Sequence, residues 1–335
     1  MKSKCKYALL VVMGALLSGC ATTPTFLNPN SSVAADEATL YNEVLIEAIG
    51  VFVIVAGLLA WILIRDHGRS PKDVKIPKLY LNPRKEVTWV IIPVLLVVSL
   101  DAFDFVLELH TMNTTAAPAP QASDVNLKVI GHRWWWEFDY PDLGIKTANE
   151  LHVPVGKIVQ ADVTGYDVIH SFWIPQLTGK QDAIPGQINH VWFKADKVGD
   201  FHGQCVEFCG QNHANMRIKV VVQSQKDFDA WVANQQKPAP QPQTEQQKTG
   251  YDLIATGVCS SCHTLNGTKG NADIGPNLTH LFSRSVFAGA TLDTTPANVR
   301  AWIKDTQALK PGNDMDINVS QKQLDALMSY IVLLK

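Results

Sequence analysis

Four of the six cysteines in this chain fall in two short clusters, and both clusters are typical of redox metals. The first is Cys205-x-Glu207-x-Cys209-x-x-x-His213-x-x-Met216, with His170 upstream, and the second is Cys259-Ser260-Ser261-Cys262-His263. A chain of 335 residues has room for two or three domains. The pattern therefore predicts two redox centres in series, as in an electron relay.

Soft thiolates with imidazoles and a weak thioether form the ligand set of electron-transfer copper. Two cysteines four residues apart can bridge two copper ions, and His170 and His213 then supply one terminal imidazole each. The Met216 thioether and the Glu207 main-chain carbonyl would supply the long axial bonds. Two alternatives remain: a closed zinc site made of two cysteines and two histidines, and a disulfide between the two cysteines outside the cytoplasm.

The pattern Cys-x-x-Cys-His is the covalent attachment signature of haem c. The thiols of Cys259 and Cys262 would bind the haem, and His263 would be the proximal iron ligand. A thioredoxin-like redox pair is the main alternative, but it requires a βαβ setting. Helical patterns flank this motif at residues 250–257 and 321–334 instead.

Three residues beyond the motif compete for the second axial position on the iron. Met328 lies among apolar residues at helical spacing, where core packing is expected. Met315 lies in a polar loop and is the ligand that we predict, and His280 is the third candidate. Ligation by His and Met raises the potential of a haem, which suits an electron donor to copper.

The N-terminus has the features of a secretory signal, with Lys2, Lys4 and Lys6 before an apolar run and a small-residue cleavage site. Leu17-Ser18-Gly19-Cys20 resembles a bacterial lipobox. We therefore expect a lipoprotein-type signal peptide over residues 1–19 and lipidation of Cys20. A retained membrane helix is the alternative, although the run is shorter than the roughly 20 residues that span a bilayer.

Residues 40–110 predict a transmembrane hairpin, with spans at 44–64 and 87–109. Lys and Arg are abundant between the spans and absent from 21–43, so the positive-inside rule places that loop in the cytoplasm and both flanks outside. Acidic side chains in the spans indicate contact with a larger membrane subunit. The net charge of −2 gives no indication of a nucleic-acid partner, and we expect none.

Beyond the hairpin, residues 123–232 contain short segments rich in β-branched and aromatic residues, which predict a β-sandwich or barrel. These segments are Val125–Ile130, Leu151–Pro154, Ile158–Val163, His190–Phe193 and Ile218–Val222. Residues 233–249 are rich in Gln and Pro and predict a linker. Residues 250–335 have the size of one small helical domain organised by a large prosthetic group.

Four segments together resemble subunit II of haem-copper cytochrome c oxidases, the family with the dinuclear CuA centre. They are Gly131-His132-Arg133-Trp134-Trp135-Trp136, His170-Ser171-Phe172-Trp173-Ile174-Pro175, Asp182-Ala183-Ile184-Pro185-Gly186 and Gly203 through Met216. The likeness runs from about residue 40 to 225. It implies an all-β, cupredoxin-like barrel for the middle domain.

The same resemblance assigns roles to single residues. The copper ligands it implies are His170, Cys205, Glu207, Cys209, His213 and Met216. The carboxylate of Glu207 would also bind magnesium at the boundary with the catalytic subunit. Trp134 would be the aromatic through which electrons enter, and Glu86 the carboxylate at the cytoplasmic mouth of a proton pathway. A solvated loop charge is the alternative for Glu86.

The last domain resembles the all-α class I cytochromes c. Ile274-Gly275-Pro276-Asn277-Leu278-Thr279-His280-Leu281 and Lys310-Pro311-Gly312-Asn313-x-Met315 look like the cytochrome domain fused to caa-type oxidase subunit II. The chain departs from that pattern at Asp316, where the family usually has Pro.

The resemblance implies a multidomain, multi-pass protein of the bacterial inner membrane, with both redox domains on the outer, periplasmic face. As a subunit of a proton-pumping terminal oxidase, it would accept electrons at haem c and pass them through CuA to subunit I, which reduces oxygen to water. The implied partners are subunits I and III and a donor such as a cytochrome c or a quinol-oxidising complex. Two other functions stay open: a donor subunit of a nitric oxide reductase, and a lipid-anchored copper chaperone or sensor.

Overall fold

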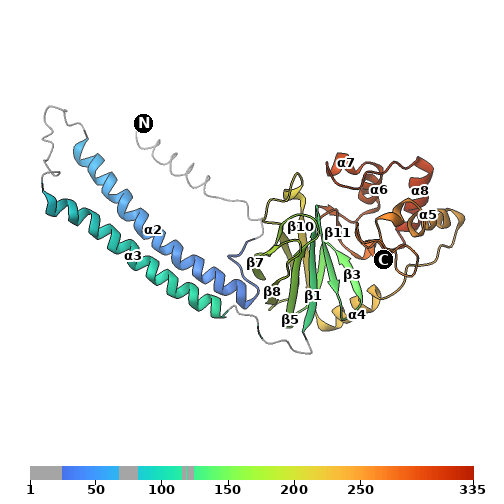
Figure 1. Ribbon diagram of the computed structural model, residues 1–335, viewed down its shortest axis with the longest axis horizontal. Helices are drawn as coiled ribbons and strands as arrows, with labels where there is room; N and C mark the ends of the chain where they lie inside the picture. The colour runs from blue at the N-terminus through green and yellow to red at the C-terminus, as the bar shows by residue number, and fades with distance from the viewer. Residues whose placement is uncertain (1–24, 68–81, 115–117, 119–123) are drawn as a thin grey trace, which may run out of the picture.

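The computed structural model describes residues 25–67, 82–114, 118 and 124–335. The predicted signal peptide, Cys20 and most of the basic loop between the two spans lie outside the described residues. The described parts form three units along the chain: a pair of long helices, a β-sheet domain, and a helical domain at the C-terminal end (Figure 1).

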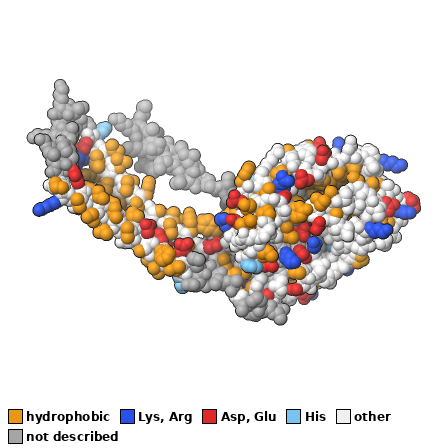
Figure 2. Space-filling model, in the orientation of Figure 1, with side chains coloured by type: hydrophobic (Ala, Val, Ile, Leu, Met, Phe, Trp, Pro, Cys, Tyr) orange, Lys and Arg blue, Asp and Glu red, His pale blue; other side chains and the backbone are white. Residues whose placement is uncertain are grey.

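Two long antiparallel helices, α2 (Ser32–Asp66) and α3 (Pro83–Thr114), contain the two predicted spans. Both are long and apolar enough to cross a membrane. Large apolar side chains lie exposed along both of them, and orange atoms gather along the hairpin in Figure 2. Glu86 lies exposed in the first turn of α3, at the end of the hairpin remote from the β-domain (Figure 1).

The start of α2 packs against the β-domain rather than standing free. With 35 residues the helix is about 52 Å long, well beyond the roughly 30 Å hydrocarbon core of a bilayer. Ser31 caps it by accepting a hydrogen bond from Ala34 N at 3.0 Å, and the Ser31 hydroxyl donates to Leu177 O at 2.6 Å. Val33 and Ala38 are buried in the same contact. The helix therefore passes from the apolar region directly into the β-domain.

The β-domain consists of three separately hydrogen-bonded sheets, with strand orders β3-β2-β1-β5-β8, β4-β10-β9 and β6-β7. The strands are β1 (Val125–His132), β2 (Trp135–Tyr140), β3 (Ile145–Ala148), β4 (Glu150–Pro154), β5 (Ile158–Gly165), β6 (His170–Ile174), β7 (Thr178–Ala183), β8 (Asn189–Lys194), β9 (Gly199–Gln204) and β10 (Arg217–Gln223). All five segments expected from the sequence are strands. Large buried side chains such as Trp136, Phe138, Phe172 and Leu151 form the core.

The cupredoxin-like class is confirmed, but the predicted barrel is not closed. The chain leaves the first sheet at the end of β3 and enters the second at β4, with only Asn149 between them. Asn149 takes a left-handed conformation, φ 63°, which Asn tolerates better than most residues. Its side chain accepts from Trp136 N in one sheet, and its carbonyl accepts from Lys219 N in the other. The single residue Asn149 thus links the first and second sheets, which are not joined by strand-to-strand hydrogen bonds.

The C-terminal domain is helical, as predicted, with a two-stranded ribbon of β11 (Val286–Phe287) and β12 (Leu292–Asp293). Its helices are α5 (Glu245–Ala255), α6 (Pro296–Lys304), α7 (Thr306–Leu309) and α8 (Gln321–Ile331). The first and last of them cross closely at Gly250. A Cβ on that residue would lie 2.1 Å from Ala326 O, so only glycine fits at the crossing.

The segment predicted as a linker, residues 233–249, overlaps the end of α4 (Gln225–Gln235) and the start of α5. Its middle part packs against the helical domain. Ala239 is buried and its N–H donates to Asn266 O at 3.0 Å, while Pro240 O accepts from the Tyr330 hydroxyl at 2.8 Å. Composition predicted a free tether here, and the structure has a packed connection instead.

Candidate metal and haem centres

The predicted copper ligands lie on the loop between β9 and β10 and at the start of β6. Cys205 directly follows β9, and Met216 directly precedes β10. The Cys205 N–H donates to Met216 O at 2.9 Å, which extends the β9–β10 ladder and closes the loop. His170 is the first residue of β6 and is fully buried.

The structure brings all six of these residues together around the two cysteines. The Cys205 and Cys209 sulfurs are 3.8 Å apart. Around Cys205 Sγ lie His170 Nδ1 at 4.0 Å and Glu207 O at 3.3 Å. Around Cys209 Sγ lie His213 Nδ1 at 3.6 Å and Met216 Sδ at 3.8 Å. Each sulfur therefore has one imidazole and one weak donor beside it.

The arrangement of donors around the two sulfurs argues against the two alternatives left open by the sequence, a disulfide and a closed zinc site. Both cysteines are free thiols, and a sulfur separation of 3.8 Å is far beyond the roughly 2.05 Å of a disulfide. A closed zinc site needs four donors, whereas six lie together here, with one imidazole and one weak donor beside each sulfur. The donor set thus fits two copper ions bridged by thiolates.

The two thiols are also electrostatically coupled. The hydrogen bond with Cys209 lowers the pKa of Cys205 to about 4, and the same contact raises the pKa of Cys209. Because a metal takes cysteines as thiolates, metal binding at this pair would release the protons that the thiols still carry.

Asp167 orients His170, and sequence reasoning missed it. Its carboxylate is 2.9 Å from His170 Nε2, which leaves Nδ1 facing the cysteine sulfur. It also accepts from the Arg133 N–H at 2.8 Å. Because such carboxylate partners fix the ring and tautomer of a metal-binding histidine, Asp167 supports the site without belonging to the donor set. Its position three residues before His170 was the only sequence signal.

The Glu207 side chain, predicted to bind magnesium, is exposed on the same loop. Its backbone carbonyl faces the Cys205 sulfur. The carbonyl of Glu207 therefore belongs to the copper site, while its carboxylate is open to solvent. Glu86 is distant from this loop.

The haem attachment motif lines a cavity of about 440 Å³. Cys259, Cys262, His263 and Met315 all contribute to its wall. The His263 Nδ1–H donates to Pro276 O at 2.7 Å, which leaves Nε2 free for iron, and burial lowers the pKa of His263, which keeps the ring neutral. A Cβ at Gly275 would lie 2.6 Å from this ring.

Two further residues, which the sequence did not reveal, support a haem in this cavity. Trp302 Nε1 donates to Met315 Sδ at 3.2 Å and so holds the thioether in the wall. The buried Arg284 also lines the cavity, and its Nε has no hydrogen-bond partner within the described part of the chain. An unpaired buried donor is costly, and an anionic group of a haem would satisfy it. The residues present therefore fit haem c.

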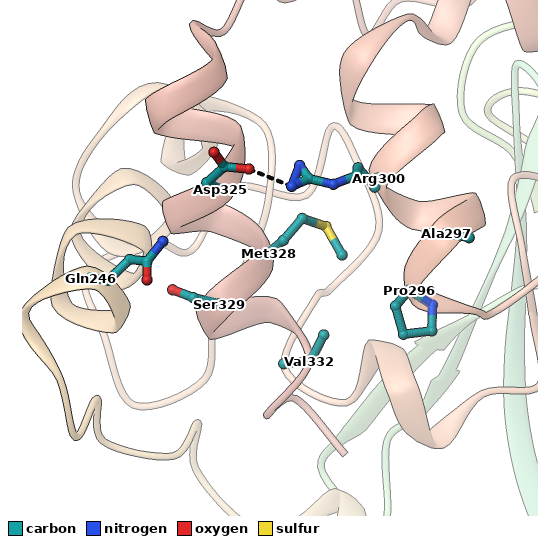
Figure 3. A pocket seen from close by; sticks show the side chains of 8 residues that line it. All are labelled: Gln246, Pro296, Ala297, Arg300, Asp325, Met328, Ser329 and Val332. Atoms are coloured by element: carbon teal, nitrogen blue, oxygen red, sulfur yellow. Dashed lines mark hydrogen bonds and ion pairs between the residues drawn. The ribbon is translucent and has the colours of Figure 1, made fainter.

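Met328 and His280, the other candidates for the second axial ligand of the iron, do not line the haem cavity. Met328 faces a surface hollow beside the Arg300–Asp325 ion pair, between α6 and α8 (Figure 3). The ring nitrogens of His280 contact Lys335 O at 2.8 Å and Lys237 O at 3.1 Å. Met315 is the only one of the three that lines the haem cavity.

Trp134 connects the two centres. Its ring Nε1 donates to Cys209 O at 2.9 Å, and the residue also lines the haem cavity together with Arg133, Trp135 and Asn149. These four residues belong to the β-domain, so the haem cavity is completed by the copper domain. Trp134 is only 6% exposed because the C-terminal domain covers it.

The fold and the two sites define a class: a membrane-anchored electron-transfer subunit with a copper domain and a c-type cytochrome domain. The profile of the periplasmic domain of cytochrome c oxidase subunit II matches residues 143–224, and the cytochrome c profile matches residues 247–335. The chain is 33% identical to cytochrome c oxidase subunit 2 of Alkalihalophilus pseudofirmus, over 100% of this chain and 98% of the relative. It is 32% identical to that of Bacillus subtilis, over 98% of this chain and 96% of the relative.

A third relative, cytochrome c oxidase subunit 2 of Bacillus sp. strain PS3, is 34% identical over 80% of this chain and 79% of its own length. The chain belongs to the cytochrome c oxidase subunit II family. It is a component of an oxidoreductase complex that includes subunit I. The first domain implies CuA copper, the second implies haem c, and the match to a periplasmic domain indicates an outer-face location.

Replacing Asp167 should weaken copper binding while the β-domain stays folded. In Asp167→Ala, His170 loses the contact that directs Nδ1 toward Cys205, and loss of such a partner typically costs about 10- to 100-fold in metal affinity. Competition for copper against a chelator measures the effect. The matched control is Asp162→Ala, which removes the exposed Asp162–His190 contact. Equal copper affinity in the two variants would contradict the orienting role.

Proposed function

We propose that the chain relays electrons from haem c through Trp134 to the dinuclear copper centre and on to subunit I, where oxygen is reduced to water and protons are pumped. One observation carries this proposal. Trp134 lines the haem cavity and also contacts the copper loop, where its indole N–H donates to Cys209 O. A single buried residue therefore offers a covalent and hydrogen-bonded route between the two centres.

The proposed copper ligands are His170, Cys205, Glu207 through its carbonyl, Cys209, His213 and Met216. When bound, the two coppers would share one electron through the bridging thiolates, so that little changes in geometry on reduction. The protein contributes a rigid setting for this. The loop is closed by the β9–β10 ladder, and His170 is held by Asp167.

In the cytochrome domain, the proposed covalent attachment is through Cys259 and Cys262, with His263 and Met315 as axial ligands. Trp302 holds the Met315 thioether, and Arg284 supplies a buried positive charge beside the cavity.

Several finer roles belong to the same proposal. Glu86 would mark a proton entrance on the cytoplasmic side, and the exposed Glu207 carboxylate would bind magnesium against subunit I. Cys20 would be lipidated after removal of residues 1–19. The domain boundaries are 40–110 for the hairpin, 123–232 for the copper domain, 233–249 for the linker and 250–335 for the cytochrome domain. Further partners would be subunit III and a donor such as a cytochrome c or a quinol-oxidising complex.

Electron paramagnetic resonance tests the dinuclear assignment. In the oxidised full-length protein, the copper signal should show hyperfine coupling to two equivalent copper nuclei, because both thiolates are shared. Cys209→Ser should reduce this to coupling with one nucleus, whereas Cys262→Ser should affect haem attachment and leave the copper pattern intact. Coupling to a single nucleus in the unmodified protein would rule out the bridging role of the two cysteines.

Optical spectra test the axial ligand of the haem. Met315→Ala should retain covalently bound haem, because Cys259 and Cys262 remain, but it should lose the weak thioether-to-iron band of the oxidised protein and lower the haem potential. Met328→Ala is the matched control and should keep the band, because Met328 faces the surface hollow. If the Met328 variant loses the band and the Met315 variant keeps it, the ligand assignment is wrong.

Deletion of residues 250–335 tests the direction of the relay. The truncated complex should keep its copper and should still reduce oxygen when a small artificial donor reaches Trp134, which the deletion uncovers. Its turnover with the native donor should fall sharply, because haem c is the proposed entry point. Oxygen uptake with each donor decides the matter, and unchanged turnover with the native donor would falsify the role given to the cytochrome domain.

A further inference from the structure

The copper and cytochrome domains meet in an interface built largely from backbone groups. The Arg217 N–H donates to Gly289 O at 2.8 Å, and the Asn212 side chain donates to Pro311 O. The carboxylate of Glu150 accepts from the Ser285 N–H at 2.9 Å. Each contact joins the copper domain to a loop of the cytochrome domain.

Lys310 lies at the centre of this interface and is 4% exposed. Its ammonium donates three hydrogen bonds: to Trp134 O at 2.6 Å, to Asn215 O at 2.8 Å and to Ala288 O at 3.0 Å. Two of these carbonyls belong to the copper domain, and the third belongs to the cytochrome domain. A lysine ammonium has three donors, so all of them are used.

The partners of Lys310 are unusual because all three are neutral. Its contacts in the described part of the chain include no carboxylate, and burial lowers its pKa to about 7. A buried ammonium costs free energy unless its hydrogen bonds are made. The three carbonyls offset part of the cost of burying the ammonium, and they surround it together only while the two domains are docked.

The backbone positions that Lys310 holds are those nearest the two centres. Trp134 is the residue whose indole reaches Cys209 O, and Asn215 directly precedes Met216. Lys310 itself begins the loop that leads to Met315. One ammonium thus ties together the haem ligand loop, the connecting tryptophan and the copper loop.

Gly289 of the cytochrome domain lies directly against the Lys310 ammonium and the carbonyl of Asn215. The residue has φ +76°, and a Cβ there would lie 2.5 Å from both Asn215 O and Lys310 Nζ. Only glycine lets the two backbones approach closely enough for the ammonium to reach both domains.

We propose that Lys310 is a positioning residue, which clamps the cytochrome domain onto the copper domain and fixes the distance between the haem and copper centres. The inference rests on the proposed relay and deepens it. Electron transfer slows steeply as the distance between two redox centres grows. Loss of the clamp should therefore act on internal transfer and not on either centre alone.

The test uses the complete oxidase complex with Lys310→Met, which keeps the length of the side chain and removes its donors. Lys322→Met, on the exposed face of α8, is the matched control. Pulsed electron paramagnetic resonance of the oxidised complex gives the distribution of distances between haem iron and copper. Transient absorption after photochemical injection of one electron gives the rate at which haem c is reoxidised by copper.

We expect Lys310→Met to keep the haem and copper spectra, to broaden the distance distribution, and to slow internal transfer relative to Lys322→Met. Lys322→Met should match the unmodified complex in all respects. A distance distribution and a transfer rate in Lys310→Met equal to those of Lys322→Met would overturn the proposal.

Gly289→Ala provides the same test if Lys310→Met fails to accumulate, because the added Cβ would press against Asn215 O and Lys310 Nζ from the interface side. It should broaden the iron–copper distance distribution and slow the transfer in the same way, and normal values would overturn the clamp.

A separate result tests the proposed relay itself. If haem c of the unmodified complex delivers no electron to copper, the relay fails, whatever the variants do.

Discussion

The antiparallel pairing of β9 with β10 is the constraint on which the copper site and its contact with the cytochrome domain depend. It brings Cys205 and Met216 together at the mouth of the loop, with the Cys205 N–H bonded to Met216 O. The intervening residues must then fold back so that Cys209 lies 3.8 Å from Cys205. The same loop supplies the carbonyl of Cys209 to Trp134 and that of Asn215 to Lys310. The copper donors and the docking surface for the cytochrome domain are thus two sides of one loop.

The cluster of candidate copper donors could be predicted from the sequence because its chemistry is local. Five of the six donors lie within twelve residues, and Cys-x-x-Cys-His is a contiguous motif. The choice of Met315 over Met328 followed from helical periodicity, and the two side chains do lie in different surroundings. Short apolar segments likewise predicted the strands. Each of these features depends on neighbours along the chain rather than on tertiary contacts.

The features that escaped prediction depend on residues far apart in sequence. Asn149 links the two sheets of the open barrel through bonds to residues 13 and 70 positions away, Trp136 and Lys219. In the sequence, Lys310 is one more lysine in a polar loop. Only the fold places its ammonium against two backbone carbonyls of the copper domain. The connection between the domains is rich in Gln and Pro, as flexible linkers are, yet Ala239 and Pro240 are held by backbone hydrogen bonds that composition does not encode.

The burial of Trp134 beneath the cytochrome domain has a consequence for competition between donors. A docked domain on the same chain acts at a high effective concentration, so a free carrier is at a disadvantage for the same surface. The cation at this surface faces neutral carbonyls and is shielded from water, and salt screens exposed charges far more than buried ones. In the proposed relay, a free electron carrier would therefore compete poorly with the attached cytochrome domain for Trp134, and the docking of that domain should depend little on ionic strength.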